Sequence, residues 1–450
     1  MRALAKIAEA TRGTRWEGRL YVVGGSVRDE IMGNRPITDF DIVTEESAEE
    51  LAQFLYEKGI SKIEPVLYPR FGTALIRVAG INVELVRARR EEYHPESRKP
   101  DVEPATLVED ARRRDFTINA LMRNLHTQEL VDPLGCALED IRNRILRTPV
   151  DPHITFRDDP LRMLRAVRFR WKLNLTPADG LYDAIRSNRE RLRIISAERI
   201  RDEVTKMLLH PTAPEALADL MDLGLLDQFW PEFRECVDVD QGDYHSHPVW
   251  QHLLDVVRAV AERGDLVLTL SALFHDIGKA RTRSVEESGR VRFLGHEKVG
   301  AQMAAEMLLR LRFSKADAEA VALLVRNHMR LGSMEVFTPA AARRLLRDLG
   351  DQVDRLLQLC KADAHALRPI PKPIDFDHIE RVLEQVRAET KEPTFRPPLS
   401  GDEVMEILHL EPGPEVGRWL RALEEAVLDG EIPAEDKTTA REWLLRQARH

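Results

Sequence analysis

The chain has 450 residues, of which 43% are hydrophobic and 32% charged, with a formal net charge of −9. This length allows two to four domains with ample cores, whereas no apolar run approaches the roughly 18 residues needed to cross a bilayer. The N-terminus lacks the apolar core of a signal peptide, and the cysteines are too widely spaced for a zinc ribbon or a disulfide framework, so we expect a cytoplasmic protein with reduced thiols.

The net charge alone argues against a nucleic-acid partner, but the charge is unevenly distributed. From Arg142 to Lys206 the chain has 16 Lys and Arg residues against 9 Asp and Glu residues. A basic segment inside an acidic protein indicates a local site for a polyanion. The alternative is a solvated helix face that happens to be rich in arginine.

Residues 20 to about 90 alternate short β-type runs with helical patterns, which predicts a mixed α/β head. Its first strand runs into Gly24 and Gly25, where the backbone can approach a ligand closely because no Cβ intervenes. The start of the helix that follows favours an anion, and Arg28 in its first turn can contact a phosphate.

A second strand of the head carries Asp39 and Asp41. Residues two apart in a strand face the same side, so these carboxylates would repel each other without a cation between them. Mg²⁺ takes oxygen ligands and shares them with substrate phosphates, so the pair and the glycine turn indicate nucleotidyl transfer with two metal ions. Glu84 in the strand NVELVRA is the candidate third carboxylate, with an exposed strand glutamate as the alternative.

Residues 91–109 are polar and broken by proline, which predicts a mobile loop. The segment RRRDFTINAL (112–121) follows, and we expect its Arg114, Asp115 and Asn119 at the start of a helix. These side chains either bind the sugar and phosphates of a nucleotide, or Asp115 caps the helix and Asn119 ties it internally.

Beyond residue 110 the pattern is almost entirely helical, and FRDDPLRMLRAVRFRWKL (156–173) predicts one helix. A carboxylate and a bidentate arginine on one helix face can read the Watson–Crick edge of a base. The alternative is a ladder of salt bridges within the helix. Five charged residues recur there at spacings of three or four: Asp158, Asp159, Arg162, Arg165 and Arg168.

Histidines become dense after residue 240, on predicted helices whose other faces are apolar. Taken singly, such a histidine is more often a core or surface residue than a ligand. Together, four histidines and two aspartates suit a transition-metal site or a two-metal site, and the adjacent His275 and Asp276 can bind one metal or bridge two. The six candidate ligands are His252, His275, Asp276, His296, His328 and Asp363.

Three motifs, GGSVRD (24–29), DFD (39–41) and RRDFTINAL (113–121), occur in order and together resemble the class II tRNA nucleotidyltransferase and bacterial poly(A) polymerase family. The resemblance implies an α+β fold, with a small polymerase β-like nucleotidyltransferase head followed by an all-helical body. It also implies Mg²⁺-dependent addition or repair of the 3′-terminal CCA of tRNA, from CTP and ATP, without a nucleic-acid template.

The family reads the incoming base with a Glu-Asp-x-x-Arg motif, which is matched here by DDPLR (158–162). The resemblance therefore assigns base reading to Asp159 and Arg162, while Asp158 replaces the usual glutamate and its role is less defined. The resemblance also implies that three residues in the segment SAERIRDEV brace the helix that carries the base-reading motif. It further implies that the loop 91–109 takes part in the switch from C to A addition. The bracing residues are Glu198, Arg199 and Glu203.

The ordered histidines and aspartates resemble the HD superfamily of metal-dependent phosphohydrolases. This resemblance implies a helical HD domain within the body that binds a divalent transition metal or Mg²⁺. The alternative is a vestigial HD fold that binds no metal and only supports the tRNA. We expect a nucleotidyltransferase head (1–145), a helical neck for base selection and RNA binding (146–230), the HD domain (231–372) and a helical tail that contacts tRNA (373–450).

Several alternatives stay open from the sequence. Within the same fold, the enzyme could add only A, add only CC, or make poly(A). The HD domain could instead be the main activity, as a phosphohydrolase acting on RNA ends or nucleotides, and a tRNA-binding chaperone without turnover is a third possibility. We expect no membrane partner, and the sequence leaves the oligomeric state open.

Overall fold

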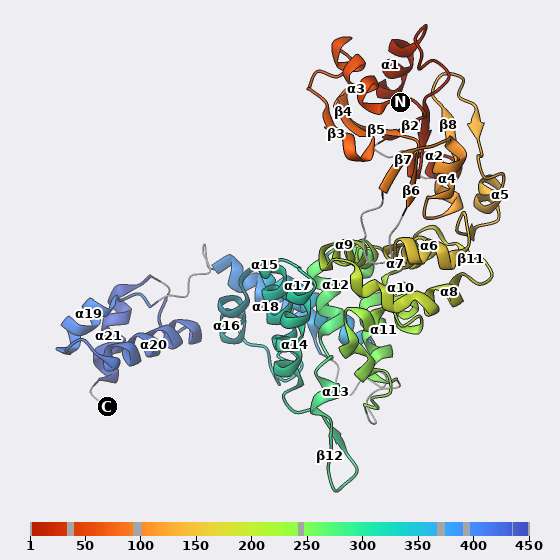
Figure 1. Cartoon of the computed structure of the whole chain (residues 1–450). Helices are drawn as coiled ribbons and strands as arrows, with labels where there is room; N and C mark the ends of the chain where they lie inside the picture. The colour runs from red at the N-terminus through yellow and green to blue at the C-terminus, as the bar shows by residue number, and fades with distance from the viewer. Residues whose placement is uncertain are drawn as a thin grey trace. The chain divides into compact units, whose positions relative to one another are not determined.

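The computed structural model describes residues 2–33, 40–92, 101–241, 247–366, 374–389, 397–433 and 435–448. The chain divides into two compact units, Met1–Met207 with Glu215–Pro231, and Leu208–Pro214 with Glu232–His450. Figure 1 shows a sheet-containing head at the N-terminal end of the chain and helices in the rest. The expectation of an α+β chain with a small head and a helical body is confirmed.

The head is built on one seven-stranded sheet with the order β3-β4-β5-β2-β1-β8-β9, in which β2 and β5 run parallel and the other neighbours antiparallel. A separate ribbon pairs β6 with β7. The strands are β1 Tyr21–Val23, β2 Phe40–Thr44, β3 Val66–Tyr68, β4 Thr73–Val78, β5 Ile81–Arg87, β6 Arg89–Glu92, β7 Asp101–Pro104, β8 Met122–Asn124 and β9 Leu130–Val131.

Helices pack on both faces of this sheet, because alternate strand residues on each face are apolar. On one face Val23 and Val43 pack with Ala111 and Met122 in a buried cluster. Figure 1 shows α1 and α3 on the other side of the sheet. The helices of the head are α1 Arg2–Thr11, α2 Gly25–Ile31, α3 Ala48–Glu57, α4 Leu107–Arg112 and α5 Ala137–Arg142, with 3₁₀ turns η1 Pro69–Phe71 and η2 Thr117–Asn119.

A helical neck follows the head. Its central helix α7 is buried along much of its length, and Asn174 ends it in the left-handed conformation. The neck elements are β10 Ile145–Leu146, α6 Pro152–Asp158, α7 Leu161–Leu173, β11 Thr176–Pro177, α8 Leu181–Asn188, η3 Arg189–Ile194, α9 Ala197–Leu208, α10 Ala213–Asp222, η4 Leu226–Gln228 and η5 Pro231–Cys236.

Across its described residues, the second unit is helical apart from one short hairpin. Helix α12 is buried along most of its length and is capped by the Asp265 side chain, which accepts from the backbone N–H of Leu268. The elements are α11 Val249–Val260, η6 Ala261–Arg263, α12 Leu266–Phe274, α13 Lys279–Thr282, β12 Ser284–Val285, β13 Val291–Arg292, α14 His296–Arg310, α15 Lys315–Asn327, α16 Pro339–Leu349, η7 Gly350–Gln352, α17 Val353–Ala366, α18 Phe376–Glu389, α19 Gly401–Leu408, α20 Pro414–Asp429 and α21 Lys437–Gln447.

The expected cysteine chemistry is confirmed, because Cys136, Cys236 and Cys360 are all free. Across the described ranges, no helix combines the length and the apolar character that crossing a membrane requires.

The helices α19, α20 and α21 share a small core of their own, which includes Leu423 and Trp443.

Candidate functional site

One cross-strand row of the head sheet brings two of the predicted carboxylates together. The register pairs Val23 with Asp41, and Asp41 with Glu84, so these side chains project from the same face. Partial burial and the negative charge of Asp41 raise the pKa of Glu84. The pair therefore favours a cation nearby. Asp39, the other predicted carboxylate, lies outside the described residues.

The predicted glycine turn lies directly beside this carboxylate row. Gly24 precedes α2 with φ +81°, in the region that favours glycine. A Cβ at Gly24 would lie 3.6 Å from Asp41 Oδ2 and 4.0 Å from Arg114 Nη1. The backbone turn, a carboxylate and a guanidinium thus converge on one point of the head, and Gly25 begins α2 next to them.

The other polar residues predicted near the turn form a buried network. Arg28 donates to Asn119 Oδ1 at 2.5 Å and to Asp29 Oδ1 at 2.7 Å, and Asn119 in turn donates to Asp115 Oδ1 at 2.9 Å. The expected helix start in this segment is a single 3₁₀ turn, Thr117–Asn119. Arg28 is buried. The bond from Asn119 to Asp115 is the internal tie that the sequence offered as an alternative, and the phosphate contact of Arg28 stays a prediction.

The prediction of one continuous helix over residues 156–173 is wrong. Helix α6 ends at Asp158 and α7 begins at Leu161. Pro160 has no N–H to donate and disfavours the helical conformation in the residue before it, so Asp159 is extended, with φ −133° and ψ 98°. The helical spacing of the two aspartates relative to the arginines therefore does not hold across this break.

The arginines of α7 contact segments far away in sequence. Arg162 Nη2 donates to the carbonyl of Arg113 at 2.6 Å, and Arg165 donates to Asp115 Oδ2 at 2.6 Å. Through these bonds α7 is attached to the segment that carries Arg114. The salt-bridge ladder within the helix is therefore not what positions Arg165.

Helix α9 braces α7 and the break before it. The family resemblance implied this role for three residues of α9, and two of them make such contacts. Arg199 Nη2 donates to Asp159 Oδ2 at 3.1 Å, and Arg168 Nε donates to the buried Glu203 at 2.6 Å. The bracing by Arg199 and Glu203 is confirmed, and that by Glu198 stays a prediction.

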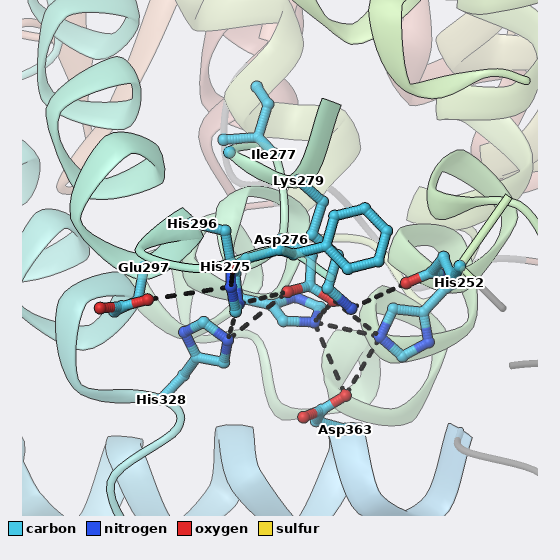
Figure 2. Close-up of polar contacts among 12 residues, drawn as sticks. His252, His275, Asp276, Ile277, Lys279, His296, Glu297, His328 and Asp363 are labelled. Atoms are coloured by element: carbon cyan, nitrogen blue, oxygen red, sulfur yellow. Dashed lines mark hydrogen bonds and ion pairs between the residues drawn. The ribbon is translucent and has the colours of Figure 1, made fainter. Parts of the chain in front are cut away.

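The six predicted ligands of the body come together in a single buried cluster, shown in Figure 2. They form two groups of three residues, and within each group the candidate ligand atoms lie within 4.8 Å of one another. Three of them lie at helix ends. His275 and His328 are the C-cap residues directly after α12 and α15, and His296 begins α14. The first group is His252, His275 and Asp363, and the second is Asp276, His296 and His328.

Three of these histidines are oriented by backbone carbonyl groups that precede them in the chain, within the same helix for His275 and His328 and just before the helix for His296. In each, ring Nδ1 lies 2.6–2.8 Å from the carbonyl oxygen three residues earlier. A carbonyl can only accept, so Nδ1 carries the hydrogen, and in the neutral imidazole Nε2 is the nitrogen with a lone pair for a metal. The three are His275, His296 and His328.

Asp276 lies between the two groups. Its Oδ2 is 3.2 Å from His275 Nε2 and its Oδ1 is 3.2 Å from His296 Nε2. Oδ1 is buried and has no hydrogen-bond donor among the described residues, while Lys279 Nζ lies 2.6 Å from Oδ2. A buried carboxylate that lies between the two groups, with one oxygen lacking a donor, fits a residue that would hold divalent cations.

The charge of the cluster also favours a cation. Burial lowers the pKa of His275, but the negative charges of Asp276 and Asp363 outweigh it and raise that pKa to about 10. Four imidazoles and two carboxylates are the donor set of divalent transition metals. The side chain of Asp363 is 20% exposed and those of the other five at most 8%, so the cluster opens to solvent on its side.

Two residues that position these sites were missed from the sequence. Gly278 has room for no side chain, since a Cβ there would lie 2.2 Å from the carbonyl oxygen of His296, and this contact brings α14 against the segment after Asp276. Asp110 is fully buried between two arginines. Its spacing of three and four from Arg113 and Arg114 was the available signal.

The fold and these two sites define a nucleotidyltransferase head joined to a helical body with an HD-type cluster. Family models match along the chain in the same order: the poly A polymerase head domain at residues 20–147, the probable RNA and SrmB-binding site of polymerase A at 174–236, and the HD domain at 242–368.

Curated relatives agree over most of the chain. The A-adding tRNA nucleotidyltransferase of Deinococcus radiodurans is 37% identical over 357 residues, which is 76% of this chain and 80% of the relative. The CC-adding tRNA nucleotidyltransferase of Thermus thermophilus is 35% identical over 439 residues, which is 94% of this chain and 93% of the relative. The chain therefore belongs to the tRNA nucleotidyltransferase family.

A solved structure has the same fold. The CCA-adding enzyme of Bacillus stearothermophilus, in complex with CTP, superimposes with a TM-score of 0.72 at 24% identity, covering 100% of this chain and 97% of that one.

Proposed function

We propose that the chain adds or repairs the 3′-terminal CCA of tRNA with CTP and ATP, and that Asp39, Asp41 and Glu84 form the catalytic centre. The observation that carries this proposal is the adjacency of Asp41 and Glu84 on one sheet face, beside the turn at Gly24 and Arg114. Carboxylates next to a phosphate-binding turn are what transfer of a nucleotide from a triphosphate requires.

The carboxylates of the head fit Mg²⁺, because it prefers hard oxygen ligands and near-octahedral sites shared with phosphates. The raised pKa of Glu84 supports this fit, since burial and the negative charge of Asp41 both raise it. When bound there, Mg²⁺ supplies positive charge for the attacking 3′-hydroxyl and the leaving pyrophosphate.

The remaining predicted residues divide into binding and positioning roles. Arg114 faces the glycine turn and binds the triphosphate. Asp159 and Arg162 read the base edge, and Arg165 and Arg168 keep α7 in place through their bonds to Asp115 and Glu203. The basic segment of the neck holds the acceptor end of the tRNA.

Asp159→Asn is expected to weaken base selection more than addition itself. The carboxylate accepts from the edge of a correct base, and one such contact is worth about 1–3 kcal/mol of discrimination. The ratio of kcat/KM for CTP to that for UTP on tRNA lacking CCA is expected to fall about tenfold. Asp183→Asn, an exposed aspartate of the neck, is the matched control. An unchanged ratio in Asp159→Asn would remove it from base reading.

The proposed function is tested with the purified chain, Mg²⁺ and one tRNA ending in the discriminator base, in -C, in -CC or in -CCA. CTP and ATP are supplied singly and together, and the products are resolved to one nucleotide. Growth of every truncated end to CCA followed by arrest is the expected result. Extension of only the -CC end by a single A would instead mean an A-adding enzyme, and arrest after CC would mean a CC-adding enzyme. A long A tail would mean a poly(A) polymerase.

A second activity is favoured by the buried cluster of the body. We infer that the HD domain binds two divalent cations, one in each group of three ligands, with Asp276 between them. Such a pair supplies the chemistry for hydrolysis of a phosphate ester by an activated water. The opening at Asp363 would admit the substrate.

A further inference from the structure

Asp110 is a buried carboxylate of the head to which the proposed function assigns no role. It lies in α4 with an exposed fraction of 0%. Its Oδ1 accepts from Arg113 Nη2 at 2.7 Å and from the backbone N–H of Arg89 at 3.4 Å, and its Oδ2 accepts from Arg114 Nη2 at 2.8 Å. Both oxygens are therefore held by donors from fixed directions.

The charge of this carboxylate is kept inside the protein by its partners. Burial alone raises the pKa of Asp110, but the positive charges of Arg114 and Arg113 outweigh burial and hold that pKa below its usual range. Breaking a buried pair of this kind leaves the remaining charge without compensation. Removing the charge of Asp110 would therefore release both guanidinium groups.

Arg114 is the partner that connects Asp110 to the proposed nucleotide site. One terminal nitrogen, Nη2, bonds to Asp110, while the other, Nη1, lies 4.0 Å from the point where a Cβ at Gly24 would be. That point is 3.6 Å from Asp41 Oδ2. The Nε of Arg114 is buried without a hydrogen-bond partner among the described residues, so the guanidinium is held at one end only.

The same carboxylate also touches two other parts of the site. The N–H of Arg89 belongs to the first residue of β6, the strand that leads out of the sheet after Glu84. Arg113, bonded to Oδ1, offers its carbonyl to Arg162 of α7. Asp110 thus lies where the strand β6, the nucleotide-facing Arg114 and the attachment of α7 meet.

We infer that Asp110 is a positioning residue for the incoming nucleoside triphosphate, which fixes Arg114 so that its Nη1 contacts the phosphates beside Asp41. This inference rests on the proposed function of the head. It predicts that Asp110 acts through Arg114 alone. Arg114 lies beside the turn at Gly24, whereas the Arg113 side chain bonds Asp110 through both Nε and Nη2 and its backbone carbonyl contacts α7.

The test is a double-mutant cycle on CTP binding, measured by calorimetry on the full chain with Mg²⁺ and repeated as KM for CTP with tRNA. Asp110→Asn and Arg114→Ala are each expected to weaken CTP binding about tenfold, and the double variant no further. Arg113→Ala removes an ion-pair partner of Asp110 that is equally buried, and it is the matched control, with CTP affinity within about twofold of wild type.

Additive losses in the double variant, or an equal loss in Arg113→Ala, would overturn the inference, because Asp110 would then act as a general structural ion pair. Thermal unfolding of each variant shows whether the head is folded. If Asp110→Asn does not fold, Arg114→Lys decides, since a lysine cannot bond Asp110 and reach the turn at once; wild-type CTP affinity in Arg114→Lys would overturn the inference. A wild-type chain that adds no nucleotide would contradict the proposed function instead.

Discussion

Asp41→Ala is expected to abolish nucleotide addition by this protein, with a single-turnover rate at least about a thousandfold below wild type. The reason is that Asp41 is the central carboxylate of the row between Val23 and Glu84, and a lost metal ligand removes several kcal/mol of charge stabilisation. The rate is measured with tRNA ending in -CC and saturating ATP, where one added nucleotide reports one chemical step.

The control for this prediction separates chemistry from folding and from RNA binding. Glu57→Ala removes an exposed carboxylate of α3, in the same head but away from the carboxylate row, and is expected to add nucleotides at the wild-type rate. Asp41→Ala should still bind tRNA, because the basic neck is unchanged. Glu84→Gln is expected to have a smaller effect. If Asp41→Ala added nucleotides normally, the head would not be the catalytic domain.

The sheet of the head was predictable because its signals are local. The alternation of strand side chains predicted that Asp39 and Asp41 share one face of their strand, and the glycines mark where a strand meets a helix. The parallel pairing of Asp41 with Glu84 is a tertiary fact that no local pattern contains, although it agrees with the choice of Glu84. The burial of Arg28 depends on Asn119, 91 residues away, and was therefore not visible from spacing.

The neck shows how one residue can outweigh a strong pattern. The charged residues of 156–173 recur at helical spacing, yet Pro160 ends that regularity and leaves Asp159 extended. The proline was in the sequence, and its effect on the residue before it is general. What could not be derived is the outcome: Asp159 turns to Arg199 of α9, and Arg162 reaches back to the carbonyl of Arg113.

The HD cluster was predictable in membership but not in arrangement. The order of the histidines and aspartates along the chain named the six residues, and each was expected on or near a helix whose other face is apolar. Their division into two groups depends on helix packing, for which Gly278 against the His296 carbonyl is decisive. Only the structure places Asp276 between His275 and His296.

Asp276→Ala is expected to remove all metal from the HD domain while nucleotide addition by the head persists. Among the residues that the structure describes, Asp276 is the one carboxylate within 3.2 Å of imidazole nitrogens in both groups of ligands. His252→Ala and His296→Ala each affect one group, so each should lose about one equivalent of metal. Metal content is measured by elemental analysis of protein equilibrated with Mn²⁺, Ni²⁺ or Zn²⁺, and hydrolysis is followed with p-nitrophenyl phosphate.

The comparison between single variants decides between one ion and two. His365→Ala, an exposed histidine of α17 two residues after Asp363, is the matched control and should keep the full metal content. Two equivalents in wild type, one in each histidine variant and none in Asp276→Ala would establish the bridged pair. One equivalent in wild type, lost equally in all three variants, would mean a single ion held by both groups. Wild-type metal content in Asp276→Ala would remove Asp276 from the set of ligands. A wild-type chain that binds no metal would make the cluster a structural core, in which protonated histidines and Lys279 balance the carboxylates.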